Sequence, residues 1–301
     1  MLHESLQELA QIAGECEDLA MLRGVAAESQ VLLRNAIDHD APAHEIVPWY
    51  SKLISDALHS EAVLDATGGV HLVLSGAVGR GDALPSSTIT WLAVRAEGAR
   101  IEHDPSNVIA STLEDLGFVV AKPPQRLDPR PKSDWLHHID HAEGTELNLF
   151  ADAGTWALRR VNEREDFTDL LKAALELQPP TVHAKAGMPE TAAVLSVRDQ
   201  LLAPIVGLAR WAGACAECPS ASTPERLQYA QSAEVLHPEE ASLLLEAFNA
   251  AQSLELERWA QRVQAAQTAP SSLTAIQRSI FGASARSVAD VMRAVAGRHT
   301  R

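Results

Sequence analysis

The residues best placed for chemistry lie in a glycine-rich segment between two predicted strands. The apolar run 70–74 predicts a buried strand, the glycines after it predict a tight turn that approaches a phosphate, and residues 88–94 predict a second strand. Alternate residues of a strand share a face, so we expect Thr88 and Thr90 to point to the same side. Two carboxylates at these positions would hold the Mg²⁺ that neutralises a triphosphate, and a neutral hydroxyl is a poor substitute.

Seven residues of this segment follow a known motif in order, without insertion or deletion: Gly76, Gly79, Arg80, Gly81, Asp82, Pro85 and Ser87. The segment therefore resembles the protein-PII uridylyltransferase-like branch of the polymerase-β nucleotidyltransferase superfamily. Three positions depart from the family pattern. Ala77 replaces a Gly or a phosphate-contacting Ser, and Thr88 and Thr90 replace the paired Asp residues of the motif. The retained residues favour shared ancestry and fold, and the lost residues argue against ordinary catalysis.

A second resemblance covers residues 196–259. The sequences Val197-Arg198-Asp199 and His237-Pro238-Glu239 lie among the residues that carry it. This region is similar to the helical substrate-binding domain that follows a nucleotidyltransferase domain in a bacterial family. Together the two resemblances imply an α+β fold. They imply a small mixed-sheet nucleotidyltransferase-like domain (66–160) and a helical substrate-binding domain (161–301), and the apolar spacing before them predicts an N-terminal helical segment (1–65).

The family resemblance also implies roles for individual residues. Thr88 and Thr90 occupy the catalytic positions of the lost Asp pair, and Asp152 follows a predicted third strand, near the family's third carboxylate. The implied nucleotide-binding residues are Gly76, Gly79, Arg80, Gly81 and Asp82. In the alternative interpretation, the glycines form a simple turn between the strands and Arg80 is a solvated charge. We predict no resident metal, so Mg²⁺ and a nucleoside triphosphate are expected only if activity persists, with Asp82, Asp152 or Glu102 as ligands.

The net charge and the hydropathy of the chain limit the classes of binding partner that we expect. The 301 residues carry a formal net charge of −15, whereas nucleic-acid binders usually show a basic surface. We therefore expect a protein or a small molecule as the partner. No apolar run approaches the roughly 18 residues that a membrane span needs, and the polar N-terminus does not read as a secretory signal. These features predict a cytoplasmic protein, and the sequence leaves its oligomeric state open.

Other clusters of reactive residues have a structural and a functional interpretation. Cys215-Ala216-Glu217-Cys218 forms a CxxC without the further ligands that a zinc site needs, which favours a structural role. His137, His138 and His141 could share a metal on a helix, although surface histidines are commoner. Arg198, Asp199 and Arg210 are expected to form an ion pair that bridges domains or to contact a substrate.

The remaining pattern is mostly helical. Residues 1–62 predict two or three helices, with an apolar stripe of Leu2, Leu6, Leu9 and Ile12. Further helices are predicted from 106 to 116, from about 135, and from 165 onward. The latter include 188–211 with a kink at Pro204, and 224–233 with Thr223 as the N-cap. We predict a third strand at 146–150, a surface loop at 121–134 and a disordered tail after Gly297.

Two hypotheses for the function follow. The first is a nucleotidyltransferase-family protein that transfers a nucleoside monophosphate to a protein or small molecule, with impaired catalysis. The second is a non-catalytic relative that regulates or scaffolds a partner in signalling and at most senses a nucleotide. The pair Thr88 and Thr90 separates them and favours the second.

Overall fold

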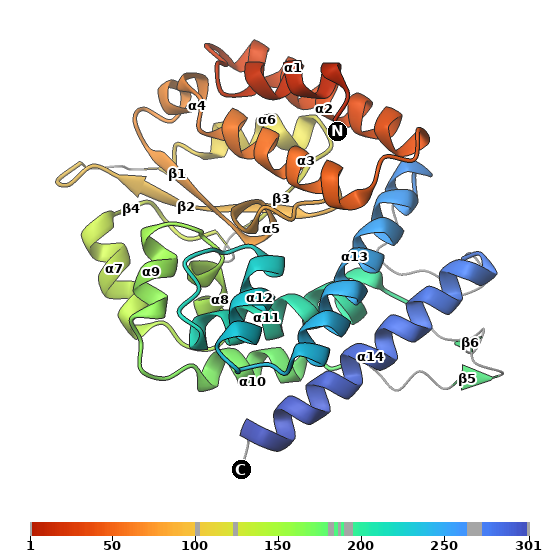
Figure 1. The fold of residues 1–301 in the computed structure, drawn as a ribbon. Helices are drawn as coiled ribbons and strands as arrows, with labels where there is room; N and C mark the ends of the chain where they lie inside the picture. The colour runs from red at the N-terminus through yellow and green to blue at the C-terminus, as the bar shows by residue number, and fades with distance from the viewer. Residues whose placement is uncertain are drawn as a thin grey trace. The chain divides into compact units, whose positions relative to one another are not determined.

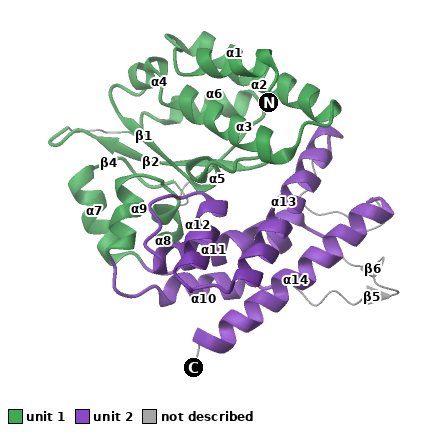
Figure 2. Cartoon of the chain, in the orientation of Figure 1, with its two compact units in different colours: residues 1–142, 146–163 green, residues 143–145, 164–301 purple. Residues whose placement is uncertain are grey.

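The structure is a computed structural model, and it describes residues 2–99, 103–122, 126–179, 184–185, 188–189, 195–263 and 273–299. Its fold is α+β, as predicted, with many helices around one small mixed sheet (Figure 1). The chain forms two compact units (Figure 2). The first unit contains Met1–Ala142 and Glu146–Glu163, and the second contains Glu143–Thr145 and Arg164–Arg301. The N-terminal helices and the sheet thus belong to one unit, and the division into three domains stays a prediction.

The first unit begins with a group of helices. They are α1 (Glu4–Ala13), α2 (Leu19–Asp38), α3 (Ala43–Leu58) and α4 (Glu61–Ala66). The side chain of Asp18 accepts a hydrogen bond from the backbone N–H of Met21, which caps the start of α2. Trp49 of α3 donates its indole N–H to the carbonyl of Leu6 at 2.8 Å and so ties α3 to α1. The predicted stripe of α1 is buried at Leu6 but not at Ile12, which is 40% exposed.

The sheet is built around one long strand. Strand β1 (His71–Ser75) pairs antiparallel with β2 (Thr88–Arg95). Two short strands pair parallel with β2: β3 (Val119–Val120) near its start and β4 (Arg130–Pro131) near its end. Within the first unit, Figure 1 shows the sheet between α1–α4 with α6 (Asn107–Asp115) on one side and α7 (Lys132–His141) with α9 (Trp156–Asn162) on the other. The sheet core is aliphatic and aromatic, with Leu72, Leu74, Ile89 and Trp91 all buried.

The remainder of the first unit corrects one predicted strand. It contains α7 (Lys132–His141), α8 (Glu146–Ala151) and α9 (Trp156–Asn162). Residues 146–150, predicted as a strand, are therefore helical. Leu147 and Phe150 are both buried and lie three residues apart, which is the spacing of one helix face. The predicted loop at 121–134 also differs, because β4 and the start of α7 lie within it; residues 123–125 are outside the described part.

The second unit is almost entirely helical in its described part. Its helices are α10 (Thr168–Glu176), the π-helix η1 (Arg198–Leu202), α11 (Ala203–Cys215), α12 (Thr223–Ser232), α13 (Pro238–Ala260) and α14 (Ala275–His299). Two short strands, β5 (Ala184–Lys185) and β6 (Met188–Pro189), pair antiparallel. The helix predicted from 188 is therefore wrong at its start. The wide π turn of η1 stands next to Pro204, whose missing N–H cannot continue the normal ladder.

Two further expectations for the second unit are wrong in detail. Ser222, rather than Thr223, is the N-cap of α12. The tail predicted to be disordered is helical as far as His299, and only residues 300–301 lie outside the described part. Arg298 forms a paired contact with Glu240 of α13, with N–O distances of 2.6 and 2.7 Å. This charge-assisted pair gives the end of α14 a partner that the sequence pattern alone did not reveal.

Close helix packing in the second unit depends on small residues of α11. A Cβ atom added to Gly213 would lie 2.6 Å from Cγ of Arg226, whose side chain is 1% exposed. A Cβ added to Gly207 would lie 3.1 Å from Cβ of Ala174. The two glycines therefore let α12 and α10 approach α11 closely. A second cluster, formed largely by η1, α13 and α14, buries Leu201, Leu254 and Phe281 among others.

Candidate functional site

The two threonines of the motif lie at the start of β2. Thr90 pairs with Ser75, the last residue of β1, so it stands where the chain leaves the sheet. Thr88 lies two residues earlier on the same face of the strand. The hydroxyl oxygen of Thr90 is buried and has no hydrogen-bond partner among the described residues. The structure thus places a neutral hydroxyl, with no hydrogen-bond partner among the described residues, at the second of the two positions where the resembled motif has an aspartate.

The glycine segment between the strands contains a short helix, α5 (Gly76–Arg80), where we predicted only a tight turn. Gly76 opens this helix with φ at +60°, a value that side chains disfavour, and a Cβ there would lie 3.2 Å from Cγ2 of Thr90. Gly81 ends the helix in the left-handed conformation, with φ at +78°. The motif glycines are therefore required by the backbone itself, whether or not a phosphate binds there.

Gly79 faces the segment that carries Asp152. A Cβ atom at Gly79 would lie 2.3 Å from the carbonyl oxygen of Asp152 and 2.6 Å from that of Leu74. Both contacts are shorter than real Cβ atoms tolerate, and both partners are backbone atoms. Gly79 therefore allows α5 to pack directly on the end of β1 and on the turn after α8. The structure brings Thr90 and Asp152 against opposite ends of the same short helix.

Helix α8 fixes the position of Asp152. Ser75 of β1 donates a hydrogen bond to the carbonyl of Leu149 in α8. At the other end of α8, Glu146 lies 2.8 Å from Nε2 of His138, while Nδ1 of His138 lies 2.9 Å from the guanidinium of Arg130. An arginine can only donate, so Nδ1 accepts and Nε2 donates to the carboxylate. These contacts tie α8 to β1, β4 and α7, and so hold Asp152 beside α5.

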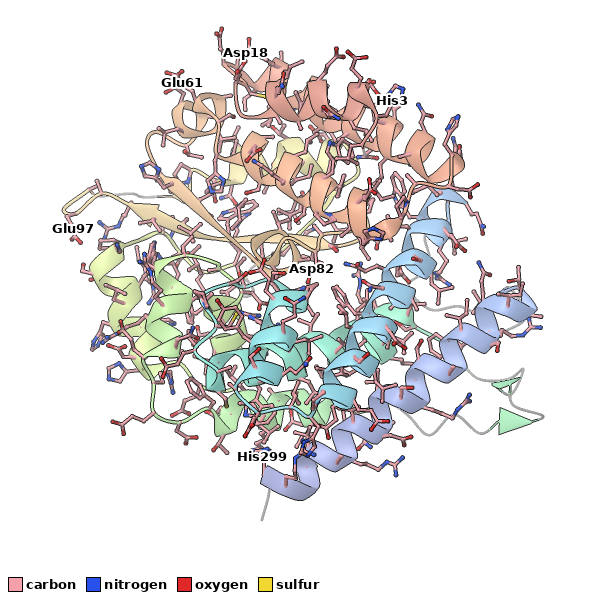
Figure 3. All side chains as sticks on the ribbon, viewed as in Figure 1. His3, Asp18, Glu61, Asp82, Glu97 and His299 are labelled. Carbon is pink, nitrogen blue, oxygen red and sulfur yellow. The ribbon has the colours of Figure 1, made fainter. Side chains whose placement is uncertain are left out.

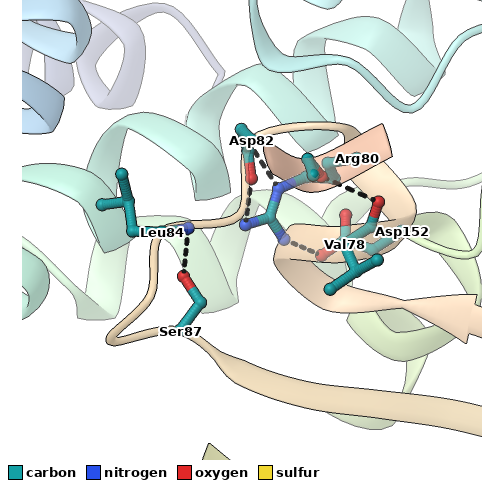
Figure 4. A network of polar contacts seen from close by, with 7 residues as sticks. Val78, Arg80, Asp82, Leu84, Ser87 and Asp152 are labelled. Atoms are coloured by element: carbon teal, nitrogen blue, oxygen red, sulfur yellow. Dashed lines mark hydrogen bonds and ion pairs between the residues drawn. The ribbon is translucent and has the colours of Figure 1, made fainter. Parts of the chain in front are cut away.

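Arg80 forms the centre of the site (Figure 4). Its guanidinium lies 3.0 Å from each carboxylate oxygen of Asp82, through Nε and Nη2, and Nη1 donates to Oδ2 of Asp152 at 2.5 Å. The three side chains are only 11%, 7% and 4% exposed, respectively. The structure therefore pairs Arg80 with both of the retained acids, instead of leaving it as a solvated charge.

The electrostatics of this cluster keep Arg80 charged. Burial alone would lower the pKa of Arg80, but the negative charges of Asp152 and then Asp82, together with their hydrogen bonds, outweigh burial and raise that pKa. The guanidinium thus remains cationic at every physiological pH. Two carboxylates and one permanent cation are together buried from solvent, and the cation compensates the negative charge of the acids.

The residues present do not fit a metal site for a triphosphate. Mg²⁺ takes charged oxygens in an octahedral arrangement, but positions 88 and 90 offer hydroxyls, and the carboxylates of Asp82 and Asp152 face the guanidinium of Arg80. Across the described residues, no group of three or more His, Cys, Asp and Glu side chains is arranged to share a metal ion. Glu102, a possible substitute ligand, lies outside the described part.

The histidine cluster of α7 divides into two environments. The rings of His137 and His141 lie with centroids 4.5 Å apart, and Nδ1 of His141 contacts the carbonyl of His137. His138 instead turns toward Phe150 and Glu146. The three side chains therefore do not form a common ligand set, and the structural interpretation holds for His138.

The cysteines of the CxxC pair are both thiols, with Cys215 exposed and Cys218 buried. Burial raises the pKa of both, that of Cys215 to about 11. A thiol with a raised pKa carries little thiolate at neutral pH, and the thiolate is the reactive form. Cys218 therefore has the properties of a packing residue, and Cys215 those of an exposed thiol of low reactivity. In η1, Asp199 accepts a hydrogen bond from Ser196 at 2.9 Å, and the predicted bridging ion pair with Arg198 or Arg210 stays a prediction.

Sequence reasoning missed two features of the units. The pairing of Arg80 with Asp152 joins residues 72 positions apart and has no local signal. The second unit also contains a cavity beside Trp211. Its one sequence signal is a large aromatic residue within α11, a helix otherwise made largely of small and aliphatic residues.

The second unit is similar to one known family. Residues 164–299 match the family described as "Putative nucleotidyltransferase substrate binding domain". This match agrees with the resemblance stated for residues 196–259 and extends it over nearly the whole second unit. It supports a nucleotidyltransferase-like family for the chain. No curated protein matches the chain. In the described residues, no helix is both long enough and apolar enough to cross a membrane.

Proposed function

We propose that this chain is a nucleotidyltransferase-like protein that has lost metal-dependent nucleotidyl transfer and acts as a cytoplasmic regulatory or scaffolding protein. One observation carries the proposal. The retained acids of the site, Asp82 and Asp152, are paired with the buried guanidinium of Arg80, and the two positions that should supply further carboxylates carry Thr88 and Thr90.

The physical argument rests on competition between two cations. A divalent ion that used Asp82 and Asp152 would have to displace Arg80 from both of them and leave a charged guanidinium buried without its partners. Breaking a buried ion pair in this way costs several kcal/mol, about 3–5 in typical cases. The hydroxyls of Thr88 and Thr90 return little of that energy, because charged oxygens dominate affinity for Mg²⁺. Metal binding at this position is therefore disfavoured by the loss of the Arg80 ion pairs and by the weakness of the hydroxyl ligands.

The second unit supplies the remaining part of the proposal. A domain similar to substrate-binding domains can bind a ligand or partner without any chemistry in the first unit. The net charge of −15 favours a protein or a small molecule over nucleic acid. In this proposal the first unit is a rigid platform that at most senses a nucleotide, and the second unit selects the partner in a signalling pathway.

The alternative function is the transfer chemistry of protein-PII uridylyltransferases. A hydroxyl or similar group of the target would attack the α-phosphorus of a nucleoside triphosphate, and pyrophosphate would leave with the electron pair of the broken bond. The family match in the second unit is compatible with this function, but the pairing of Arg80 with both acids opposes it.

Calorimetric titration of the full chain with ATP, UTP and GTP tests the proposal, each with EDTA, Mg²⁺ or Mn²⁺. We expect either no binding or weak binding that metal does not strengthen. Nucleotide binding that requires metal and disappears in Asp152→Ala would overturn the proposal. The matched control is Asp140→Ala, which removes a half-exposed carboxylate of the same unit that pairs with Arg160.

A further inference from the structure

The second unit contains a cavity of about 860 Å³ that belongs to no site described above. It is lined by α10, α11, the turn after α12 and the end of α14. His299 closes one side of it and lies at the C-terminal end of α14 (Figure 3). A volume of this size lies within the usual range for small-molecule sites, roughly 300–1,000 Å³. The cavity can therefore accept a ligand with an extended body.

The inner wall of the cavity is apolar. Phe167, Leu171, Leu175 and Val235 line it together with Trp211. Trp211 is 4% exposed, and its ring meets that of His299 edge to face, with centroids 4.9 Å apart. Trp211 therefore contributes only a small part of its ring to the wall, and the partly exposed side chains of Phe167, Leu175 and Val235 supply most of the apolar surface. The wall therefore suits a ligand with an aromatic or aliphatic body.

The rim of the cavity is acidic. Glu165, Asp166, Glu176 and Glu234 carry four carboxylates, and Lys172 carries the one ammonium among the lining residues. Hydrogen bonds from the hydroxyl and the backbone N–H of Thr168 lower the pKa of Asp166 and keep this carboxylate ionised. The remaining titratable groups that face the cavity are His299 and Cys215, and burial keeps the Cys215 thiol neutral.

The backbone at the rim adds a second observation. Glu234 has φ at +59°, a left-handed conformation that a glutamate adopts only at a cost. This conformation ends the turn after α12, and Val235, the next residue, lines the apolar wall. One strained turn thus provides both a carboxylate at the rim and an apolar contact inside.

We propose that this cavity binds a small organic cation, an amine or guanidinium attached to an aromatic or aliphatic body. The body would pack against Phe167, Leu175 and Val235, next to Trp211, and the charged group would remain at the rim beside the carboxylates. Electrostatic complementarity of this kind selects the sign of the ligand more than it adds raw affinity. The inference goes beyond the proposed function, because the cavity lies wholly in the second unit and is independent of chemistry in the first.

Three indole probes of equal body and different charge test this inference on the full chain. They are tryptamine, which is cationic, tryptophol, which is neutral, and indole-3-acetate, which is anionic. Calorimetric titration should show tryptamine binding about tenfold or more tightly than tryptophol, with indole-3-acetate weakest. Equal binding of the three probes, or no tryptamine binding at millimolar concentration, would overturn the proposal. Tighter binding of a lysine-rich peptide than of tryptamine would also overturn it, in favour of a protein partner.

Charge variants locate the binding to this cavity. The double variant Glu176→Gln/Glu234→Gln should weaken tryptamine binding about three- to tenfold and leave tryptophol binding unchanged, since exposed carboxylates each contribute modestly. The control Glu225→Gln/Glu246→Gln removes two exposed carboxylates of the same unit outside the cavity and should change neither. Equal losses in the two double variants would place tryptamine elsewhere. None of these outcomes depends on nucleotide binding, so failure here is distinct from failure of the proposed function.

Discussion

Replacement of Arg80 by methionine tests the ion-pair network of the first unit directly. Arg80→Met keeps most of the apolar stem but removes the guanidinium, so the buried carboxylates of Asp82 and Asp152 lose the cation that pairs with both of them. Removing one partner of a buried pair typically costs about 3–5 kcal/mol, because the remaining charge is left without compensation. At roughly 2–4 °C per kcal/mol for a unit of this size, the melting temperature should fall by about 10 °C.

Two control variants separate the ion-pair network from general damage. The triple variant Arg80→Met/Asp82→Asn/Asp152→Asn removes all charge from the cluster and should recover much of the lost stability, because no buried charge remains. Arg160→Met removes an exposed arginine that pairs with Asp140 in the same unit and should have a far smaller effect. Thermal melts followed by circular dichroism measure all four proteins. A loss in Arg80→Met no larger than the loss in Arg160→Met would refute the network, as would a triple variant no more stable than the single one.

Two further predictions concern packing and acid sensitivity. Gly79→Ala should destabilise the first unit by about 2 kcal/mol or more in a thermal melt, because the added Cβ would clash with two backbone carbonyls. The control Gly24→Ala should be neutral or stabilising, because a Cβ at Gly24 has no atom within 4 Å. Burial opposes the charge of Glu240, but hydrogen bonds from Arg298 and from a backbone N–H outweigh burial and lower the pKa of Glu240. The folded state therefore gains stability from this carboxylate above about pH 4.3, and it loses that stability as the pH falls through the lowered pKa. Arg298→Met should thus lower stability at pH 7 and lose its deficit in acid, and a deficit of equal size at pH 3 would disprove that reasoning.

Much of the fold could be predicted from the sequence because its periodicity is strong. The helices of both units carry apolar residues at helical spacing, and β1 and β2 are apolar runs bounded by turn residues. The secondary structure of residues 146–150 was harder to predict. Leu147 and Leu149 alternate with polar neighbours as in a strand, and only the packing of Phe150 against Trp135, with ring centroids 6.0 Å apart, shows the helical face. A short apolar run is compatible with both periods, so tertiary contacts decide.

The candidate site was predictable in its residues but not in its interactions. The order of the glycines, Arg80 and Asp82 follows a known motif, and the positive φ at Gly76 and Gly81 explains two of those glycines from backbone geometry alone. The contact between Arg80 and Asp152 depends on how α8 packs on β1, which no local pattern encodes. The same limit applies to the tail of α14, where the ion pair of Arg298 with Glu240 opposes the expected disorder.

The most direct test of the central claim is restoration of the two lost carboxylates. Thr88→Asp/Thr90→Asp places two acids on one face of β2, and their mutual repulsion should lower the melting temperature in EDTA. Mg²⁺ or Mn²⁺ should then raise the melting temperature of the variant by binding its folded state, and a nucleoside triphosphate should raise it further, while the parent does not respond. Equal metal responses in parent and variant, or a parent stabilised by millimolar Mg²⁺, would show that Thr88 and Thr90 do not mark a lost metal site.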